Sequence, residues 1–222
     1  SSTTTTRNHR MKVGVVDYGV GNLGSVLRAL EELRVAPVLV LRATDLHAAD
    51  CLILPGVGNF ADCARLLDAG GWTTALRDEV QGYKRPLLGV CVGMQLLADS
   101  STEGAVDGHG TPGLGFIPGE VQHLRTLGCT LRVPHVGWNG IKRTRTEDHL
   151  FDDIPDDTDF YFVHSYAFVP QDSADVLATT DYGVPVTAAV QRGHVWGTQF
   201  HPEKSSRAGF RLLRNFIEGP AC

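Results

Sequence analysis

Short apolar runs alternate with segments of helical periodicity in the first half of the chain. Four of these runs are continuous and rich in valine and leucine, which is typical of strands buried on both faces of a sheet: Val13–Val16, Pro37–Leu41, Cys51–Leu54 and Pro86–Val90. Helical spacing of apolar residues predicts three helices between them: Asn22–Leu33, Asp62–Leu67 and Trp72–Gln81. Strands and helices in alternation predict an α/β fold with a parallel sheet covered on both faces.

The second half reads as strands with few helices between them. The predicted strands are Val121–Arg125, Leu131–Val136, Asp159–Val169, Val176–Thr180, Val186–Gln191 and Val195–Phe200. Such a succession predicts an antiparallel extension, so the sheet is mixed but mostly parallel. An amphipathic helix over Ser205–Glu218 closes the chain, and the glycine-rich residues 104–119 are predicted to be mobile surface loops.

No linker or internal repeat divides the chain after its polar beginning. We expect residues 1–10, which read Ser-Ser-Thr-Thr-Thr-Thr-Arg-Asn-His-Arg, to be a disordered lead or an expression remnant. Residues 11–222 are then predicted to form one domain. With 42% hydrophobic and 20% charged residues, the 222-residue chain has enough apolar side chains for a sizeable core.

Charge and hydropathy exclude several classes of function. The chain has 20 Lys and Arg against 25 Asp and Glu, a net charge of -5, so it lacks the basic surface of a nucleic-acid binder. No apolar run approaches a membrane span and no signal peptide opens the sequence, so we expect a cytoplasmic protein. Five widely spaced cysteines without a CxxC pair argue against disulfides and structural zinc, and we expect no metal or cofactor.

Cys91 stands where an apolar run gives way to a helix predicted over Met94–Asp99, inside the sequence Gly89-Val90-Cys91-Val92-Gly93. This is the nucleophile-elbow pattern, with sulfur in place of the usual hydroxyl. The glycines leave room for a sharp turn that projects the central side chain at the carboxyl edge of the sheet. A helix N-terminus also favours a thiolate. The pattern predicts a nucleophile at Cys91; an inert cysteine in a βα turn is the alternative.

A cysteine nucleophile needs a base and a group that orients the base. His201-Pro202-Glu203 directly follows the predicted strand Val195–Phe200 and offers both. Residues two apart in an extended chain point to the same side, so Glu203 can hold one imidazole nitrogen of His201 while the other faces the thiol. Without Cys91, a surface loop would be the simpler interpretation.

Two rival motifs fit less well. Gly19-Val20-Gly21-Asn22-Leu23-Gly24 matches the GxGxxG nucleotide fingerprint, but Asp17 would lie close to a pyrophosphate, and Asp45 comes after its strand has ended. The His-x-Glu element of zinc deaminases is present at His201, but no Pro-Cys-x-x-Cys follows it. Neither nucleotide binding nor a catalytic zinc is favoured.

Together these residues resemble the class I (triad) glutamine amidotransferases. The elbow continues as Met94-Gln95, and four further segments are similar to the glutaminase subunits of imidazole glycerol phosphate synthase: Asp17-Tyr18-Gly19-Val20-Gly21-Asn22, Pro55-Gly56-Val57-Gly58, Gly137-Trp138-Asn139 and His164-Ser165-Tyr166. The resemblance extends from about Met11 to the last helix and implies a flavodoxin-like fold. Val92 departs from the leucine common there, which changes packing but not the backbone N–H.

The resemblance implies hydrolysis of L-glutamine to glutamate and ammonia through a glutamyl thioester on Cys91, with His201 and Glu203 completing the triad. It further implies an oxyanion hole from the backbone of Val92, Val57 and Gly58. The substrate would be held by Gly56, Gln95, Glu103 and Ser165. By pattern alone, Gln95 and Glu103 could equally be surface residues, and Gly56 and Gly58 could simply form a turn.

The resemblance also implies a partner, a cyclase subunit with a (β/α)8 barrel that uses the ammonia in histidine biosynthesis. A barrel of about 250 residues does not fit beside the predicted domain. Asn22, Trp138 and Asn139 resemble residues near the partner interface, although a half-buried tryptophan could be core. Alternatives are a glutaminase for an anthranilate, aminodeoxychorismate, carbamoyl phosphate or guanylate synthase, a non-catalytic regulatory domain, and a cysteine peptidase or esterase.

Overall fold

The predicted apolar runs of the first half form neighbouring parallel strands. β1 (Val13–Val16) lies between β2 (Pro37–Val40) and β3 (Cys51–Leu54), and β4 (Leu87–Val90) follows β3. β13 (Val195–Thr198), from near the end of the chain, pairs in parallel with β4. Every residue of β1, β3, β4 and β13 is buried, as expected for strands covered on both faces. The computed structural model describes residues 11–106 and 108–219, so the predicted lead at 1–10 lies outside the described residues.

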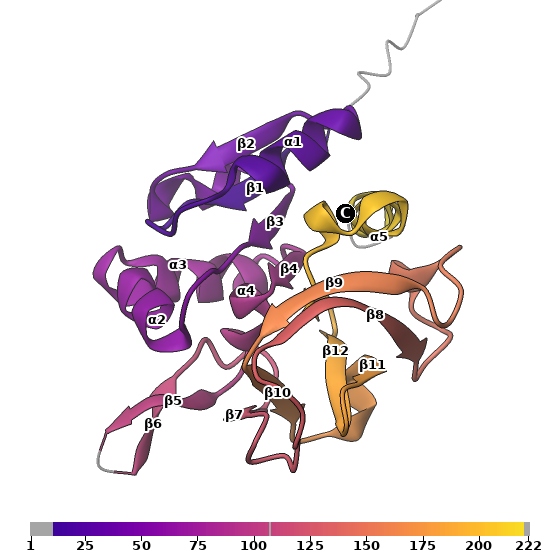
Figure 1. Cartoon of the computed structure of the whole chain (residues 1–222). Coiled ribbons are helices and arrows are strands. Elements are labelled where there is room, and N and C mark those ends of the chain that lie inside the picture. The colour runs from indigo at the N-terminus through magenta and orange to yellow at the C-terminus, as the bar shows by residue number, and fades with distance from the viewer. Residues whose placement is uncertain (1–10, 107, 220–222) are drawn as a thin grey trace, which may run out of the picture.

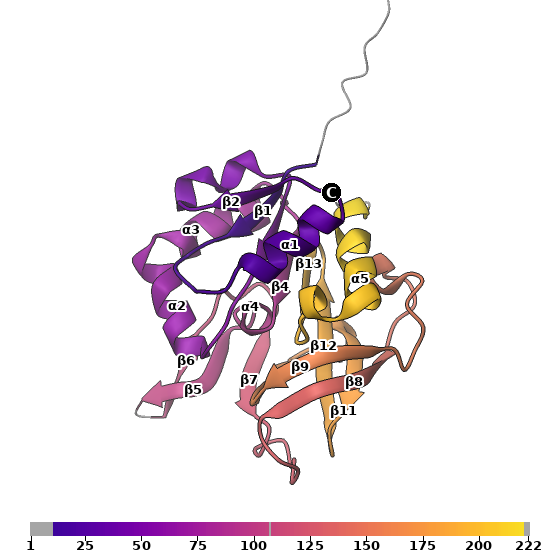
Figure 2. The same cartoon turned by 45° about the horizontal axis from the view of Figure 1, so that its top comes forward.

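Helices cover both faces of this parallel part, because its crossovers run in opposite directions along the sheet. α1 (Gly24–Glu32) joins β1 to β2, and it lies beside α5 (Ser206–Glu218) on one face (Figure 2). α2 (Phe60–Ala69) and α3 (Trp72–Arg77) join β3 to β4 on the other face. The short α4 (Val92–Gln95) directly follows β4. The described residues also form short 3-10 and π helices: η1 (Ala43–Ala48), η2 (Asp78–Gly82), η3 (His149–Phe151), η4 (Ser173–Asp175) and η5 (Pro202–Lys204).

The predicted antiparallel extension is confirmed. β12 (Pro185–Arg192) pairs antiparallel with β13, and β11 (Val176–Asp181), β8 (His135–Arg143) and β9 (Asp159–His164) follow in that order. The whole sheet has nine strands, with the order β2-β1-β3-β4-β13-β12-β11-β8-β9 (Figure 1). The sheet is mixed as predicted, but only half of its pairings are parallel, where the sequence predicts mostly parallel ones, and the change of direction falls at β13.

A second sheet, which the sequence pattern does not predict, has the order β10-β7-β5-β6. Its strands are β5 (Ser100–Val106), β6 (His109–Pro112), β7 (Gly119–His123) and β10 (Tyr166–Pro170). The prediction of loops throughout residues 104–119 is therefore wrong, because β5 and β6 form a hairpin there. The helix predicted over Met94–Asp99 is also wrong in extent, since α4 ends at Gln95 and turns lead on into β5.

Most predicted strands match observed ones to within two residues at each end, but two of them differ by more. Asp159–Val169 is not one strand, because the chain breaks at Ser165 and passes from the first sheet into the second. Leu131–Val136 is mostly irregular, and β8 begins only at His135. Pro134 carries no N–H for a strand ladder, which explains the late start. No helix within 11–106 or 108–219 combines the length and apolarity needed to cross a membrane.

Candidate active site

Cys91 occupies the sharp turn between β4 and α4. Its backbone has φ 57° and ψ −116°, a conformation that non-glycine residues rarely adopt. The residue is only 5% exposed, yet it lines the cavity described below, and its Sγ lies 3.9 Å from the carbonyl oxygen of Val163. The backbone therefore holds the thiol at the carboxyl end of the parallel strands, where the sequence pattern predicts it.

The glycines on either side of Cys91 are required by close backbone packing. A Cβ on Gly89 would lie 2.5 Å from the carbonyl oxygen of Gly93, and a Cβ on Gly93 would lie 1.9 Å from that of Leu54. Real Cβ atoms do not approach other atoms this closely. The elbow thus needs glycine at both positions for steric reasons, in addition to the conformational freedom that glycine gives a turn.

His201 and Glu203 lie together where β13 gives way to η5. The Nδ1 of His201 is 2.6 Å from Oε1 of Glu203, and each side chain is 5% exposed. Burial alone would lower the pKa of His201, but hydrogen bonding and charge interaction with Cys91 and Glu203 raise it to about 10. The structure thus brings the three predicted triad residues together. An imidazole with this proton affinity can accept a proton from the thiol.

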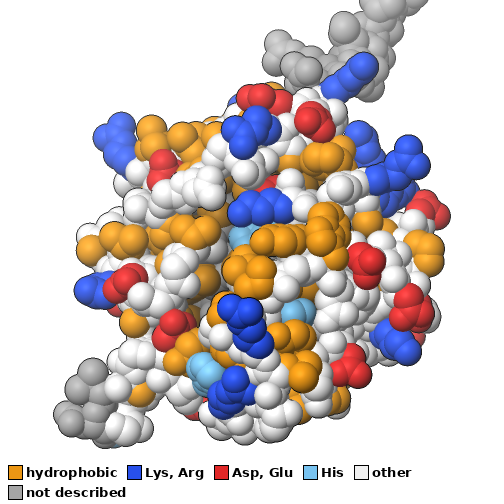
Figure 3. Space-filling view, in the orientation of Figure 1, with side chains coloured by type: hydrophobic (Ala, Val, Ile, Leu, Met, Phe, Trp, Pro, Cys, Tyr) orange, Lys and Arg blue, Asp and Glu red, His pale blue; other side chains and the backbone are white. Residues whose placement is uncertain are grey.

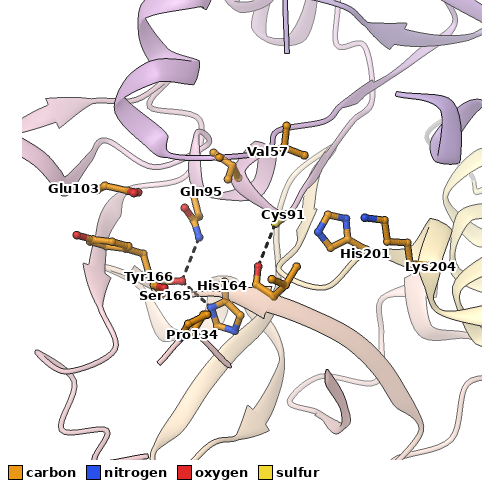
Figure 4. Close-up of a pocket in the computed structure, with 13 residues that line it drawn as sticks. Val57, Cys91, Gln95, Glu103, Pro134, His164, Ser165, Tyr166, His201 and Lys204 are labelled. Carbon is orange, nitrogen blue, oxygen red and sulfur yellow. Dashed lines mark hydrogen bonds between the residues drawn. The ribbon is translucent and has the colours of Figure 1, made fainter. Parts of the chain in front are cut away.

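A cavity of about 370 Å³ opens beside Cys91 (Figure 4). Cys91 lies between His201 on one side and Gln95 and Glu103 on the other. The wall of this cavity includes most of the residues predicted to bind substrate or oxyanion: Val57, Gly58, Val92, Gln95, Glu103 and Ser165. The volume lies in the range of small-ligand sites, and several charged and polar side chains converge on it, among them Gln95, Glu103 and His201.

The loop predicted to complete the oxyanion hole is held against the elbow. A Cβ on Gly56 would lie 2.6 Å from the amide nitrogen of Gly93, so backbone packs on backbone, and Gly58 has φ +83°. The Tyr18 hydroxyl donates to the carbonyl of Pro55 (2.7 Å). The thiol of Cys63 donates to the carbonyl oxygen of Val57 (3.3 Å). Gly56 itself is outside the cavity wall, and its contribution is this close approach.

Glu103 lies on β5 and reaches the opposite end of the cavity from His201. Its Oε2 accepts the backbone N–H of Phe60 at 3.2 Å, which ties the hairpin to the start of α2. Burial raises the pKa of this carboxyl above its ordinary value. A partly buried carboxylate at this place offers a counter-charge for an ammonium group.

Gln199 is a buried polar residue that sequence reasoning missed. It is completely buried at the end of β13, its Oε1 accepts from Gln95 (3.1 Å), and its Nε2 lies 4.0 Å from the Cys91 sulfur. A single glutamine between a strand and His201 shows no pattern in sequence. Only the proximity of the strand ends reveals it. Lys204 also lines the cavity, and the sequence analysis does not predict it as a site residue.

Two buried histidines form a pair at the cavity, and one of them, His164, lines its wall. The Nδ1 of His164 faces the Tyr166 carbonyl oxygen (2.8 Å) and can only donate to it, so Nε2 of His164 accepts from Nδ1 of His135 (2.9 Å). Burial lowers the pKa of His164 to about 3 and that of His135 to about 4. Both rings are therefore neutral at neutral pH. Asn139 reaches Nε2 of His135 (3.2 Å) and donates to the carbonyl of Asp181 (2.8 Å).

Hydrophobic side chains gather on the outer face of β8 and β9, in the middle of the surface in Figure 3. Trp138 is 53% exposed, Val136 55% and Val163 37%, and Val136 is paired with Val163 across the strands. Of the residues predicted near a partner, Trp138 lies on this face. Asn139 points to the opposite face of β8, toward the histidines, and Asn22 is exposed in the loop before α1.

Comparison with known proteins identifies the family of the chain. Residues 14–219 match the model of the glutamine amidotransferase class-I family. Imidazole glycerol phosphate synthase subunit HisH 2 of Vibrio vulnificus (strain YJ016) is 44% identical over 209 residues, 94% of each chain. The HisH subunit of Moorella thermoacetica (strain ATCC 39073 / JCM 9320) is 45% identical over 206 residues, 93% of this chain and 94% of the relative.

Solved structures share the fold at lower identity. A crystal structure of a glutamine amidotransferase superposes with a TM-score of 0.71 at 23% identity, covering 93% of this chain and 97% of that one. PurLQS from Thermotoga maritima gives 0.71 at 16% identity, covering 94% and 98%. The family match and the relatives at 44% and 45% identity show the family as well as the fold. The chain belongs to the class I glutamine amidotransferases, and within them to the glutaminase subunits of imidazole glycerol phosphate synthase.

Proposed function

We propose that Cys91 is the nucleophile that cleaves the side-chain amide of L-glutamine, with His201 as proton carrier and Glu203 as the carboxylate that orients it. The observation that carries this proposal is the triad at one end of a cavity whose other end holds Glu103. A substrate amide at Cys91 leaves the ammonium of the same molecule free to reach that carboxylate.

One imidazole, that of His201, carries every proton transfer of the reaction. The Cys91 sulfur attacks the amide carbon while its proton passes to His201. His201 then gives this proton to the departing nitrogen, ammonia leaves, and a glutamyl thioester remains. His201 next takes a proton from water, the resulting hydroxide attacks the thioester carbonyl, and the carbon–sulfur bond breaks. Glutamate leaves, and His201 returns its proton to the Cys91 sulfur. The interactions with Cys91 and Glu203 raise the pKa of His201, so it can hold the thiol proton until the nitrogen departs.

Backbone N–H groups stabilise the oxyanion that forms in each step. Val92 follows the nucleophile at the start of α4, so its N–H is one donor. The second comes from Val57 or Gly58 in the loop that packs on the elbow. One such donor is typically worth about 2.7–4 kcal/mol in the transition state. A rotation of the Val57–Gly58 peptide must break the hydrogen bond from Cys63, which makes this loop suited to regulation.

The ammonia passes to a cyclase subunit with a (β/α)8 barrel, which docks on the apolar face of β8 and β9. This face lies next to the nucleophile, because Val163 contributes to both. Its carbonyl oxygen contacts the Cys91 sulfur, and its side chain is part of the exposed apolar face. Ammonia released into water becomes protonated and loses its nucleophilicity. A partner that covers this face keeps it from solvent, and Trp138 is the kind of side chain that dominates such contacts.

Glutamate release from L-glutamine tests the proposal. We expect a low rate for the chain alone and strong stimulation by the cyclase subunit with its nucleotide ligand, and no activity for Cys91→Ala in either case. A stable thioester trapped on Cys91 and seen by mass spectrometry would identify the nucleophile directly. Activity retained by folded Cys91→Ala would overturn the assignment of the nucleophile, and equal rates with and without the partner would overturn the coupling.

A further inference from the structure

Gln199 connects the two ends of the glutamine site. Its backbone N–H donates to the carbonyl of Ala188 (2.8 Å), which fixes it at the end of β13. From there its side chain reaches Gln95 on one side and the Cys91 sulfur on the other, with no part of the residue exposed. A buried carboxamide with partners at both ends has only one favourable orientation, and that orientation can be worked out.

The direction of the whole chain of groups is set by one backbone carbonyl. The Tyr166 oxygen can only accept, so the Gln95 atom 3.1 Å away from it must be the Nε2 nitrogen. That nitrogen has a second hydrogen, and the Gln199 atom that receives it at 3.1 Å must be Oε1. The Nε2 of Gln199 is then left to face the sulfur, at 4.0 Å.

This direction decides what Gln95 offers the substrate. Both N–H groups of its carboxamide are engaged, so its oxygen remains, and Figure 4 shows that oxygen on the side of Glu103. Two acceptors, one of them a carboxylate, face the same part of the cavity. An ammonium group has three donors and no acceptor, so this pair fits it. A reversed Gln95 would present N–H donors and repel it.

We infer that Gln199 is a positioning residue: it holds Gln95 with the oxygen toward the substrate ammonium and turns its own N–H toward the Cys91 sulfur. The inference rests on the proposed function, because it assigns the two ends of the cavity to the two ends of glutamine. The Gln199 side chain then has two separate effects. Its contact with Gln95 favours glutamine binding, and its contact with the sulfur stabilises the thiolate form of Cys91.

Methionine replaces glutamine with nearly the same shape and no hydrogen-bonding amide, so Gln199→Met and Gln95→Met test the relay in the complex with the cyclase subunit. We expect Gln199→Met to raise KM for glutamine about tenfold, the loss of about one hydrogen bond. Gln95→Met raises it at least as much. The double variant has the KM of Gln95→Met alone, because Gln199 acts on binding through Gln95.

A second readout addresses the sulfur. Alkylation of Cys91 by iodoacetamide, followed on its own peptide by mass spectrometry, is expected to slow in Gln199→Met and to stay unchanged in Gln95→Met. Gln191→Met is the matched control, since Gln191 pairs with Trp196 toward the other end of β13 and lies away from the cavity. Melting temperatures establish that each variant is folded.

Two results would overturn the inference. One is a double variant whose increase in KM is the product of the two single increases, and the other is a Gln199→Met enzyme with unchanged KM. The proposed function would then still stand as long as Cys91→Ala remains inactive. If Cys91→Ala retains activity instead, the assignment of the site fails first, whatever the two glutamine variants show. Equal slowing of alkylation in both glutamine variants would count against a separate contact with the sulfur.

Discussion

The parallel and antiparallel halves of the molecule build the site by different means. On the parallel side, main chain packs on main chain, as where a Cβ on Gly93 would meet the Leu54 carbonyl at 1.9 Å. On the antiparallel side, polar side chains are held by one another, as in the pair His135 and His164. The first arrangement fixes the position of a nucleophile. The second fixes which groups donate and which accept.

This difference predicts where each half is sensitive. Changes in the main-chain contacts of the parallel half and in the triad should act on folding and on chemistry, because there is no space to absorb them. Changes in the polar side-chain contacts and on the antiparallel half should act on substrate binding, on partner affinity and on stability in acid. The four variants below test this division, beginning with the largest expected effect.

Glu203→Gln should lower kcat by about 10⁴-fold, as loss of the orienting carboxylate does in other triads. The variant should remain folded, since glutamine matches glutamate in shape. Steady-state glutaminase assays in the complex measure the change. A loss of less than tenfold would mean that the 2.6 Å contact with His201 does not serve catalysis.

The same variant predicts a shift in pH dependence. Glu203 is one cause of the raised pKa of His201, about 10, so the wild-type rate should fall only as pH rises through 10, and that fall should begin at lower pH in Glu203→Gln. The stability that this raised pKa contributes is complete below the ordinary histidine pKa of about 6.5 and is lost as pH rises through 10. Profiles of kcat/KM against pH give the comparison.

Gly93→Ala should destabilise the fold by about 3 kcal/mol, because its Cβ has no space beside the Leu54 carbonyl. Gly82→Ala is the matched control, since a Cβ there has no neighbour within 4 Å. Urea denaturation gives both free energies of unfolding. If the two variants are equally stable, β3 and the turn after β4 can move apart easily, and the parallel half is not fixed by its main-chain contacts.

Trp138→Ala should weaken binding of the cyclase subunit by about 2 kcal/mol, roughly 30-fold, while leaving stability nearly unchanged. Its side chain is half exposed, so little of the core depends on it. Leu41→Ala, at a residue 62% exposed just after the edge strand β2, serves as control. Titration calorimetry measures both affinities. If both variants bind equally well, the partner docks elsewhere.

His164→Gln should reduce the loss of stability in mild acid. Because burial holds the pKa of His164 near 3 and that of His135 near 4, the unfolded chain binds more protons than the folded one below pH 6.5. Stability is therefore complete above about pH 6.5 and declines as pH falls toward these values. His164 accounts for about 1 kcal/mol by pH 6. Denaturation at pH 7.5 and 6 should show a smaller difference in the variant than in wild type.

Much of the parallel half could be predicted from the sequence. Val13–Val16 and Cys51–Leu54 have the predicted boundaries, because a strand buried on both faces is a continuous apolar run with clear ends. The spacing of the elbow and the His-x-Glu element placed Cys91, His201 and Glu203 at neighbouring strand ends. Their side chains do meet, and their catalytic roles stay predictions.

The antiparallel half was harder to predict for a physical reason. Alternation identifies a strand but does not show which sheet it joins, so the break at Ser165 between β9 and β10 left no signal. The hairpin of β5 and β6 is glycine-rich, which pattern reading assigns to loops. Gln199 is defined by partners distant in sequence, Gln95 and Cys91, and no local spacing can reveal such a set.

The contact between Gly56 and the Val92–Gly93 peptide has a consequence for how such an enzyme can diversify. Two turns that touch through bare backbone cannot be adjusted by exchanging side chains, since any substituent at the contact forces the strands apart. Variation in activity must therefore enter around the contact, through neighbours such as Val57, Val92 and Cys63. Homologous chains can differ in how readily the loop moves while keeping the same catalytic frame.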